Sequence, residues 1–169
     1  RSFFIDVVRG DADEYTALAY FADRLLAFKK RTLYILNIAS PSPSNWFLEK
    51  TEKDKWIRVP CAVWTSKVGV FWVNSNGVFL YDGSRITDLT DGKLPSVKLT
   101  GDNHFNPSGI PLIFYIPKAR MLFVKNSAYS FDDKEDTVTL DNGGTYVYHM
   151  YSGSWSRIRQ NAYGQETNY

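Results

Sequence analysis

The sequence predicts an all-β protein, namely a β-propeller segment of about three four-stranded antiparallel blades that belongs to a larger propeller protein. Most of the chain consists of short runs of β-branched and aromatic residues separated by turn residues. These runs fall into three similar units of four strands, and four strands in every 40–50 or so residues is the period of a propeller blade. Several strands are apolar on both faces, which indicates sheets that are covered on both sides.

The three units divide the chain as follows. The approximate blades are residues 14–58, 60–99 and 109–160, residues 1–10 form the outer strand of a preceding blade, and the whole of 1–169 is one propeller region. Because three blades and one strand do not close a ring, we expect the chain to be a fragment whose missing blades come from more of the same chain or from a partner. The start at Arg1, directly in a strand and without a signal peptide, agrees with this expectation.

The repeat is visible in the second strands and in the turns. Equivalent second strands begin at Arg24, Gly69 and Arg120. The pair Asn76-Gly77 predicts a tight hairpin in the middle unit, because both residues tolerate positive φ. A helix over residues 13–26 is the alternative in the first unit, but the aromatic and β-branched residues there favour strands.

The apolar pattern supports blades over a sheet with one face in solvent. Residues 33–36, 70–73 and 78–81 are apolar on both alternating faces. A half-solvated sheet would alternate apolar with polar residues, whereas inner strands of a blade are covered by a neighbour on each side. The core of a β-sandwich or a parallel sheet would give the same signature and is the alternative.

Composition excludes several classes of protein. The 169 residues carry a formal net charge of +2, which does not indicate a nucleic-acid or membrane-surface protein, and no apolar run is long enough to span a membrane. A single cysteine, Cys61, excludes a disulfide scaffold. With only His104 and His149, a site built on several histidines is also excluded.

No motif marks a catalytic or metal site. The acids of 11–14 have a spacing that suits calcium, but they lack the rest of an EF-hand loop, and the acidic run 132–136 is typical of a solvated surface loop. We interpret Cys61 as a small buried hydrophobe and His149 as structural. We therefore expect no catalytic, cofactor-binding or metal-binding residues, no cofactor, and no enzyme.

Two groups of side chains suggest ligands but have simpler explanations. An aromatic cluster near the end of the chain can stack on sugars or bases, but large rings also fill the interfaces between blades. Its members are Tyr146, Tyr148, Tyr151 and Trp155. The basic tip at 29–31 offers phosphate contacts, but a charged turn that keeps a hairpin soluble is the interpretation we prefer.

Several of these strands carry a resemblance to a known family. The segment 14–37 resembles one that recurs in large structural proteins of tailed-bacteriophage virions, where a Thr-Ala-Leu strand leads to Arg-Leu-x-x-Phe-Lys and Leu-Tyr-Ile strands. Residues 60–63 match the next Pro-x-Ala-Val stretch loosely. Residues 69–72 and 77–83 match the following Gly-Val-Phe-Trp strand and Gly-Val-Phe-Leu-Tyr-Asp-Gly hairpin well. The resemblance covers roughly residues 5–90.

The resemblance implies a propeller-bearing virion protein of the tail nozzle or tubular type, which works as structure. We then expect a homo-oligomeric ring, contacts with other virion structural proteins, phage DNA passing nearby, no membrane, assembly in the host cytoplasm and location in the virion tail. The loops 126–144 and 40–45 are the expected contact elements. The alternative function is a glycan-binding or glycan-cleaving propeller, in which Trp155 would contact sugar, and a periplasmic sensor propeller is a third class.

Overall fold

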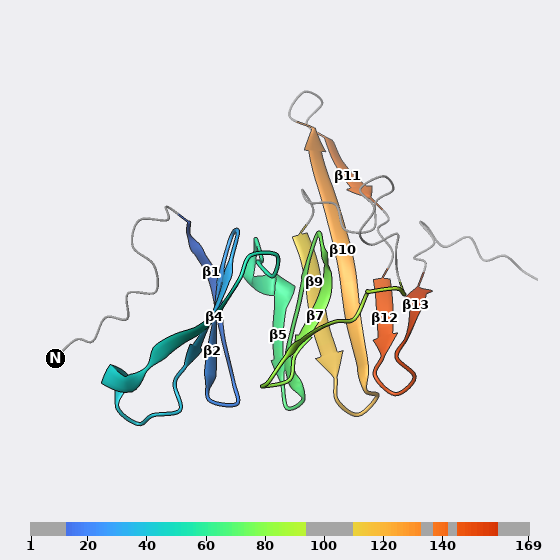
Figure 1. Ribbon diagram of the computed structural model, residues 1–169. Coiled ribbons are helices and arrows are strands. Elements are labelled where there is room, and N and C mark those ends of the chain that lie inside the picture. The colour runs from blue at the N-terminus through green and yellow to red at the C-terminus, as the bar shows by residue number, and fades with distance from the viewer. Residues whose placement is uncertain (1–12, 94–109, 133–136, 142–144, 159–169) are drawn as a thin grey trace, which may run out of the picture.

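The protein is all-β, as predicted. The computed structural model describes residues 13–93, 110–132, 137–141 and 145–158 (Figure 1). These residues form three antiparallel sheets, each with the four strands of one predicted unit, and the third sheet has one further strand. The only helical elements described are two short 3₁₀ turns, η1 (Pro43–Asn45) and η2 (Pro60–Ala62). Helix is otherwise absent from the described residues, and the predicted four-stranded antiparallel sheets are confirmed.

The first sheet follows the order of the chain. Its strands are β1 (Tyr15–Phe21), β2 (Arg24–Lys29), β3 (Leu33–Asn37) and β4 (Phe47–Glu52). The segment 13–26, for which a helix was the alternative, forms strands. Ala22 and Asp23 make the two-residue turn between β1 and β2, with φ of 49° and 56°. Two successive positive φ angles match the right-handed twist of the strands that they join.

The middle sheet also follows the chain. Its strands are β5 (Val63–Ser66), β6 (Gly69–Asn74), β7 (Gly77–Tyr81) and β8 (Ile86–Asp88). The predicted hairpin near Asn76 is present, but its loop residues are Ser75 and Asn76, and Asn76 does not have positive φ. The reason is Asn74, whose side chain accepts a bond from the Asn76 N–H at 2.7 Å and donates to the carbonyls of Asp54 and Trp56.

The third sheet carries an additional hairpin. Its strands are β9 (Ile110–Ile116), β10 (Met121–Asp132), β12 (Thr145–His149) and β13 (Ser154–Ile158). Residues 126–144, expected as a loop, are not all loop. The strand β10 continues to Asp132 and pairs there with β11 (Thr137–Asp141). Figure 1 shows this hairpin extending beyond the rest of the sheet.

The core lies between the sheets, with the middle sheet packed on both others. The strand β1 contacts β5 and β6, and β9 contacts β5, β6 and η2. One cluster of buried residues joins all three sheets. All of β6 is buried, as are residues 33–36. The prediction that residues 33–36 and 70–73 are apolar and covered on both faces is therefore confirmed.

Two neighbouring residues of β6 hold the core together. Trp72 points to the first sheet, where its ring lies 5.4 Å from that of Phe28 in an edge-to-face contact. Phe71 points to the third sheet, where its ring lies 5.2 Å from that of Tyr115. All but Tyr115 are fully buried. Burial of each large ring contributes about 4–6 kcal/mol, so these contacts dominate the packing of the sheets.

Gly69, at the start of β6, tests how tightly the middle sheet is packed. Its φ is +144°, and a Cβ there would overlap the carbonyl oxygen of Tyr81 on the next strand. We expect Gly69→Ala to lower the free energy of unfolding by about 2–4 kcal/mol, because backbone cannot move aside as a flexible side chain can. Urea denaturation followed by tryptophan fluorescence measures the change.

The matched control is Gly92→Ala. Gly92 also has positive φ, +65°, but a Cβ there would meet nothing within 4 Å. The Gly92→Ala variant should therefore lose only the conformational penalty of about 1–2 kcal/mol in its free energy of unfolding. Equal losses for the two variants would show that the close approach of Gly69 to Tyr81 carries no cost.

The turn between β7 and β8 makes stability depend on pH. One carboxylate oxygen of Asp82 accepts bonds from the backbone N–H groups of Ser84 at 2.9 Å and Arg85 at 3.0 Å. The N–H of Arg85, then that of Ser84, lower the pKa of Asp82 below its ordinary value of 3.8. Because the pKa is depressed on folding, this stabilisation is present above pH 3.8 and is lost as pH falls through the folded-state pKa.

We therefore expect the unfolding free energy of the wild type to exceed that of Asp82→Asn at pH 7, by less than about 1 kcal/mol because the group is exposed. Asparagine keeps an acceptor oxygen but removes the charge. The difference should shrink as pH falls below about 4. Urea titrations at pH 7 and pH 2.5 measure it, and a constant difference at both values would rule out the proposed linkage.

Candidate functional site

The sulfur and imidazole groups singled out in the sequence have structural partners. The half-buried thiol of Cys61 donates to the carbonyl of Pro111 at 3.4 Å, which ties η2 to β9. On the third sheet, His149 Nε2 lies 3.0 Å from Ser156 Oγ on the neighbouring strand. The first contact joins a thiol to a backbone carbonyl, and the second joins a hydroxyl and an imidazole on neighbouring strands of the third sheet.

The acids near the start of the chain pair with a turn rather than with one another. Asp13 accepts a bond from the Arg31 N–H at 3.0 Å, and Glu14 forms an ion pair with Lys30 that lowers the pKa of Glu14. In the part of the chain that the structure describes, no three acidic, histidine or cysteine side chains gather to hold a metal ion. Asp11 lies outside the described residues, as do 133–136.

The aromatic cluster of the third sheet is mostly packing. Tyr146 and Tyr148 are buried in the core, and Trp155 packs against it with its Nε1 donating to the Leu89 carbonyl at 2.9 Å. Burial raises the pKa of Tyr146, so its hydroxyl stays protonated at neutral pH. Tyr151 alone of the four points to solvent, with 86% of its surface exposed. The cluster therefore offers one exposed ring rather than a stacking platform for sugar.

The basic tip at 29–31 divides into a buried and an open part. The ammonium group of Lys29 is buried and lies 4.7 Å from the ring centre of Tyr15, with a second ring, that of Tyr34, at 5.3 Å. The next two residues of the tip, Lys30 and Arg31, line an open concavity of about 630 Å³ together with Trp56 and Arg58. Lys30 is already neutralised by Glu14, so the concavity is less positive than its composition indicates.

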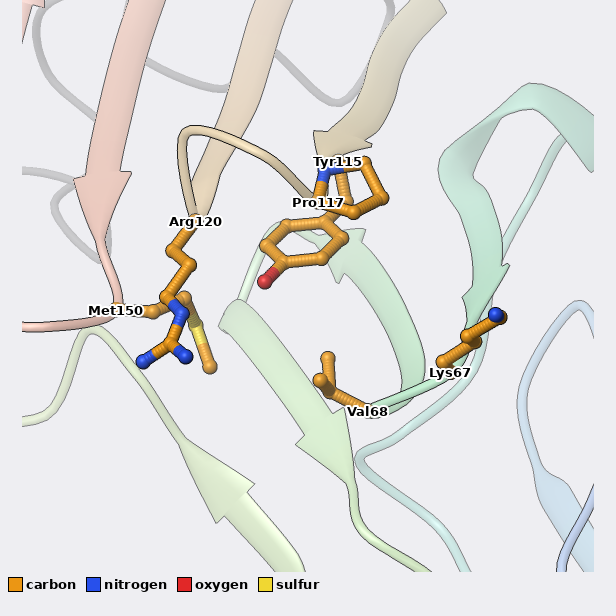
Figure 2. Close-up of a pocket in the computed structure, with 6 residues that line it drawn as sticks. All are labelled: Lys67, Val68, Tyr115, Pro117, Arg120 and Met150. Atoms are coloured by element: carbon orange, nitrogen blue, oxygen red, sulfur yellow. The ribbon is translucent and has the colours of Figure 1, made fainter.

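A second pocket, of about 400 Å³, lies where the turns of two sheets meet (Figure 2). Its lining residues are Lys67, Val68, Tyr115, Pro117, Arg120 and Met150. The first two come from the β5–β6 turn. The others come from β9, from the β9–β10 turn and from the end of β12, which share one end of the third sheet because Met121 pairs with both Ile116 and His149.

The polar groups of this pocket stand at opposite rims. Figure 2 shows the hydroxyl of Tyr115 directed to the side of Arg120, with Val68 facing the ring and Lys67 on the far side. Arg120 has φ of +50°, a left-handed conformation that costs a residue with a Cβ about 1–2 kcal/mol. Two backbone bonds hold it there, from its N–H to the Pro117 carbonyl at 3.3 Å and from the Met150 N–H to its own carbonyl at 3.0 Å.

The outer face of the first sheet is apolar and partly exposed. Strand pairing places Leu18 and Tyr20 of β1 beside alternate residues of β2 and β3 on the side away from the middle sheet. Those residues form a small buried cluster of Ala27, Tyr34 and Leu36, with Leu25 and Ile38 packed on it. Leu18 is 64% exposed and Tyr20 is 56% exposed. An apolar surface of this kind costs free energy while it faces water.

The outer face of the third sheet is built in the same way. On β9, Ile113 and Tyr115 face the core, so Leu112, Phe114 and Ile116 alternate to the other side. The ring of Phe114 stacks on that of Phe123 from β10, with centres 4.8 Å apart and planes 2° apart. Leu112 is 43% exposed and Ile116 is 38% exposed. Both end sheets therefore present apolar faces that the chain itself covers incompletely.

Sequence reasoning missed the pocket of Figure 2. Its residues come from strand β9 and from three turns that are distant in the chain, and no spacing links Lys67, Arg120 and Met150 before the sheets pack. It also left the outer faces unassigned, although the continuous apolar runs of the strands were the signal for them.

Comparison with models of known protein families and with curated proteins finds no match to this chain. The described residues include no helix that is long and apolar enough to cross a membrane.

Proposed function

We propose that this chain is a β-propeller segment of a structural protein of a tailed-bacteriophage virion, and that it works in the tail assembly (nozzle, tubular or neck) through protein–protein contacts. The observation that carries the proposal is the pair of apolar outer faces on the first and third sheets. They have the same build as the faces that already pack inside the chain.

A row of sheets with apolar faces at both ends is an incomplete stack. Inside the chain, each interface between sheets is made by aromatic and aliphatic residues of alternating strands. The same kind of surface at both ends is stabilised when another sheet covers it. Further blades of a propeller, from a longer chain or from neighbouring subunits, are the partners that fit such faces, and a closed ring leaves neither face exposed.

The virion setting is supported by the resemblance of residues 14–37, 69–72 and 77–83 to strands of phage structural proteins. In that setting the protein forms a homo-oligomeric ring, contacts other virion proteins, and lies near the passage of phage DNA. The ring is assembled in the host cytoplasm and ends in the virion tail.

Two elements, one hairpin and one loop, are suited to contacts between subunits. The β10–β11 hairpin extends beyond the third sheet (Figure 1). The segment 40–45 is closed by side-chain hydrogen bonds, in which Trp46 Nε1 donates to the Ser40 carbonyl at 2.7 Å and Asn45 Nδ2 donates to Ser40 Oγ at 3.2 Å. A segment that is ordered before binding loses less conformational entropy when it makes the contact.

Charging either outer face should block assembly without unfolding the chain. We expect Leu18→Glu and Leu112→Glu, introduced singly into the parent protein, to reduce its incorporation into virions by about tenfold or more, because burying an apolar side chain of this size contributes roughly 1.5–3 kcal/mol. Quantitative mass spectrometry of purified particles measures incorporation, and far-UV circular dichroism of each variant checks folding.

The matched control is Phe47→Glu. Phe47 is 54% exposed and belongs to the first sheet. Its pairing with Asn37 places it on the opposite face of that sheet from Leu18. Incorporation of this variant should stay at the wild-type level. Normal incorporation of both outer-face variants would contradict the role of these faces.

Deletion of residues 130–140 tests the hairpin. The strands β9 and β12 pair with residues of β10 that precede the deleted segment, and β13 pairs with β12. We therefore expect the deletion to preserve the circular dichroism spectrum and the unfolding midpoint within a few degrees, yet to impair assembly. Assembly at the wild-type level would remove the hairpin from the proposed contacts.

The setting itself is tested on material from the natural source. Denaturing mass spectrometry should find a parent polypeptide several times longer than 169 residues, and native mass spectrometry should find it in a ring of defined stoichiometry with virion proteins. A stable monomer of this chain alone, absent from phage particles, would overturn the proposed function.

A further inference from the structure

The pocket of Figure 2 has the chemistry of a site for an anion that carries an apolar group. Its walls are apolar, because Val68, Pro117, Met150 and the ring of Tyr115 make up most of the lining. Its charged groups are both cations, Lys67 and Arg120, and no acid lines it. Small-molecule sites typically combine apolar walls with a few polar groups, and here Arg120 and the Tyr115 hydroxyl stand on one side of the pocket and Lys67 on the other.

The two cations are not neutralised within the part of the chain that the structure describes. No ion pair joins Lys67 or Arg120 to a described acid, in contrast to Arg24 with Glu49 or Lys30 with Glu14. The guanidinium of Arg120 lies 5.2 Å from the ring centre of Tyr151, a contact that orients it while leaving its N–H groups free to bind in their plane.

The backbone of Arg120 supports a role for its side chain. The position has left-handed φ, which glycine adopts without strain and arginine does not. The turn is fixed by the bonds of Arg120 to Pro117 and Met150, so the strain is not relieved by a small shift. Strain held by the surrounding structure next to a cavity is a physical indicator of a site.

We propose that this pocket binds a carboxylate attached to an aliphatic or aromatic group. Arg120 binds the carboxylate through two parallel N–H donors, the Tyr115 hydroxyl on the same side donates a third bond, and Lys67 adds positive charge at the far rim. The apolar group lies against Val68 and Met150. Two sources supply this chemistry, a free small carboxylate and the C-terminal residue of a partner polypeptide.

The assignment is tested on the 169-residue chain with two probes of nearly the same size and shape, of which only one carries a carboxylate. N-acetylphenylalanine carries the carboxylate, and N-acetylphenylalaninamide replaces it with a neutral amide. Titration followed by ¹⁵N–¹H NMR should show saturable shifts at Val68 and Met150 with the acid, with a dissociation constant of about 1 mM, and at least about tenfold weaker binding of the amide.

Arg120→Gly removes the guanidinium and relieves the backbone strain, so it should fold at least as stably as the wild type. We expect it to bind the acid at least about tenfold more weakly. The matched control is Lys118→Ala, which removes a cation from the same turn that does not line the pocket. Its affinity for the acid should match that of the wild type.

The outcomes separate the two sources. Tighter binding of acetyl-Gly-Gly-Phe with a free C-terminus than of N-acetylphenylalanine would support the end of a polypeptide, and equal binding would support a free carboxylate. Equal affinity for acid and amide, wild-type affinity in a folded Arg120→Gly variant, or competition by inorganic phosphate at the affinity of the acid would overturn the assignment. The test uses the isolated chain, so its result is independent of the virion setting.

Discussion

The fold depends on the alternation of β6 between two partners. Because successive side chains of a strand point to opposite faces, Phe71 packs on Tyr115 of the third sheet while Trp72 packs on Phe28 of the first. This position costs Trp72 a hydrogen bond, because its indole N–H is buried without a partner among the described residues. That loss costs roughly 1–3 kcal/mol, whereas burial of the ring contributes about 4–6 kcal/mol, so packing prevails.

The same alternation produces the surfaces to which we assign function. A strand that must be apolar toward the middle sheet is also apolar on its far side in β2, β3, β9 and β10. The chain gains a core on one face of each end sheet and leaves the other face incompletely covered. Rules for a half-solvated sheet would place polar residues there. Their scarcity on the outer faces is the basis of our proposal that further sheets cover these faces.

The sequence predicted what local patterns determine. Apolar residues on both faces of 33–36 and 70–73 predicted buried strands, and Asn76-Gly77 predicted the hairpin of the middle sheet. The hairpin of β11 was missed because the charged residues between 132 and 137 indicated a solvated loop, although Val138 and Leu140 alternate with threonines as in a strand. The pocket was not predictable, because packing alone brings its turns together. An arginine in left-handed conformation leaves no signal in a sequence, since glycine is the residue expected there.

Tyr115 belongs both to the pocket and to the interface between the middle and third sheets, so ligand binding and the stability of that interface are linked. The Tyr115 ring packs on Phe71 at the interface between the middle and third sheets, while its hydroxyl side faces the pocket. The lining also takes residues from both sheets, Val68 from one and Arg120 from the other. A ligand that touches both sheets binds only when they are packed together, so its binding free energy adds to the stability of that interface. The pocket is therefore placed where occupancy strengthens the packing of the third sheet, whose outer face and hairpin we assign to contacts with other subunits.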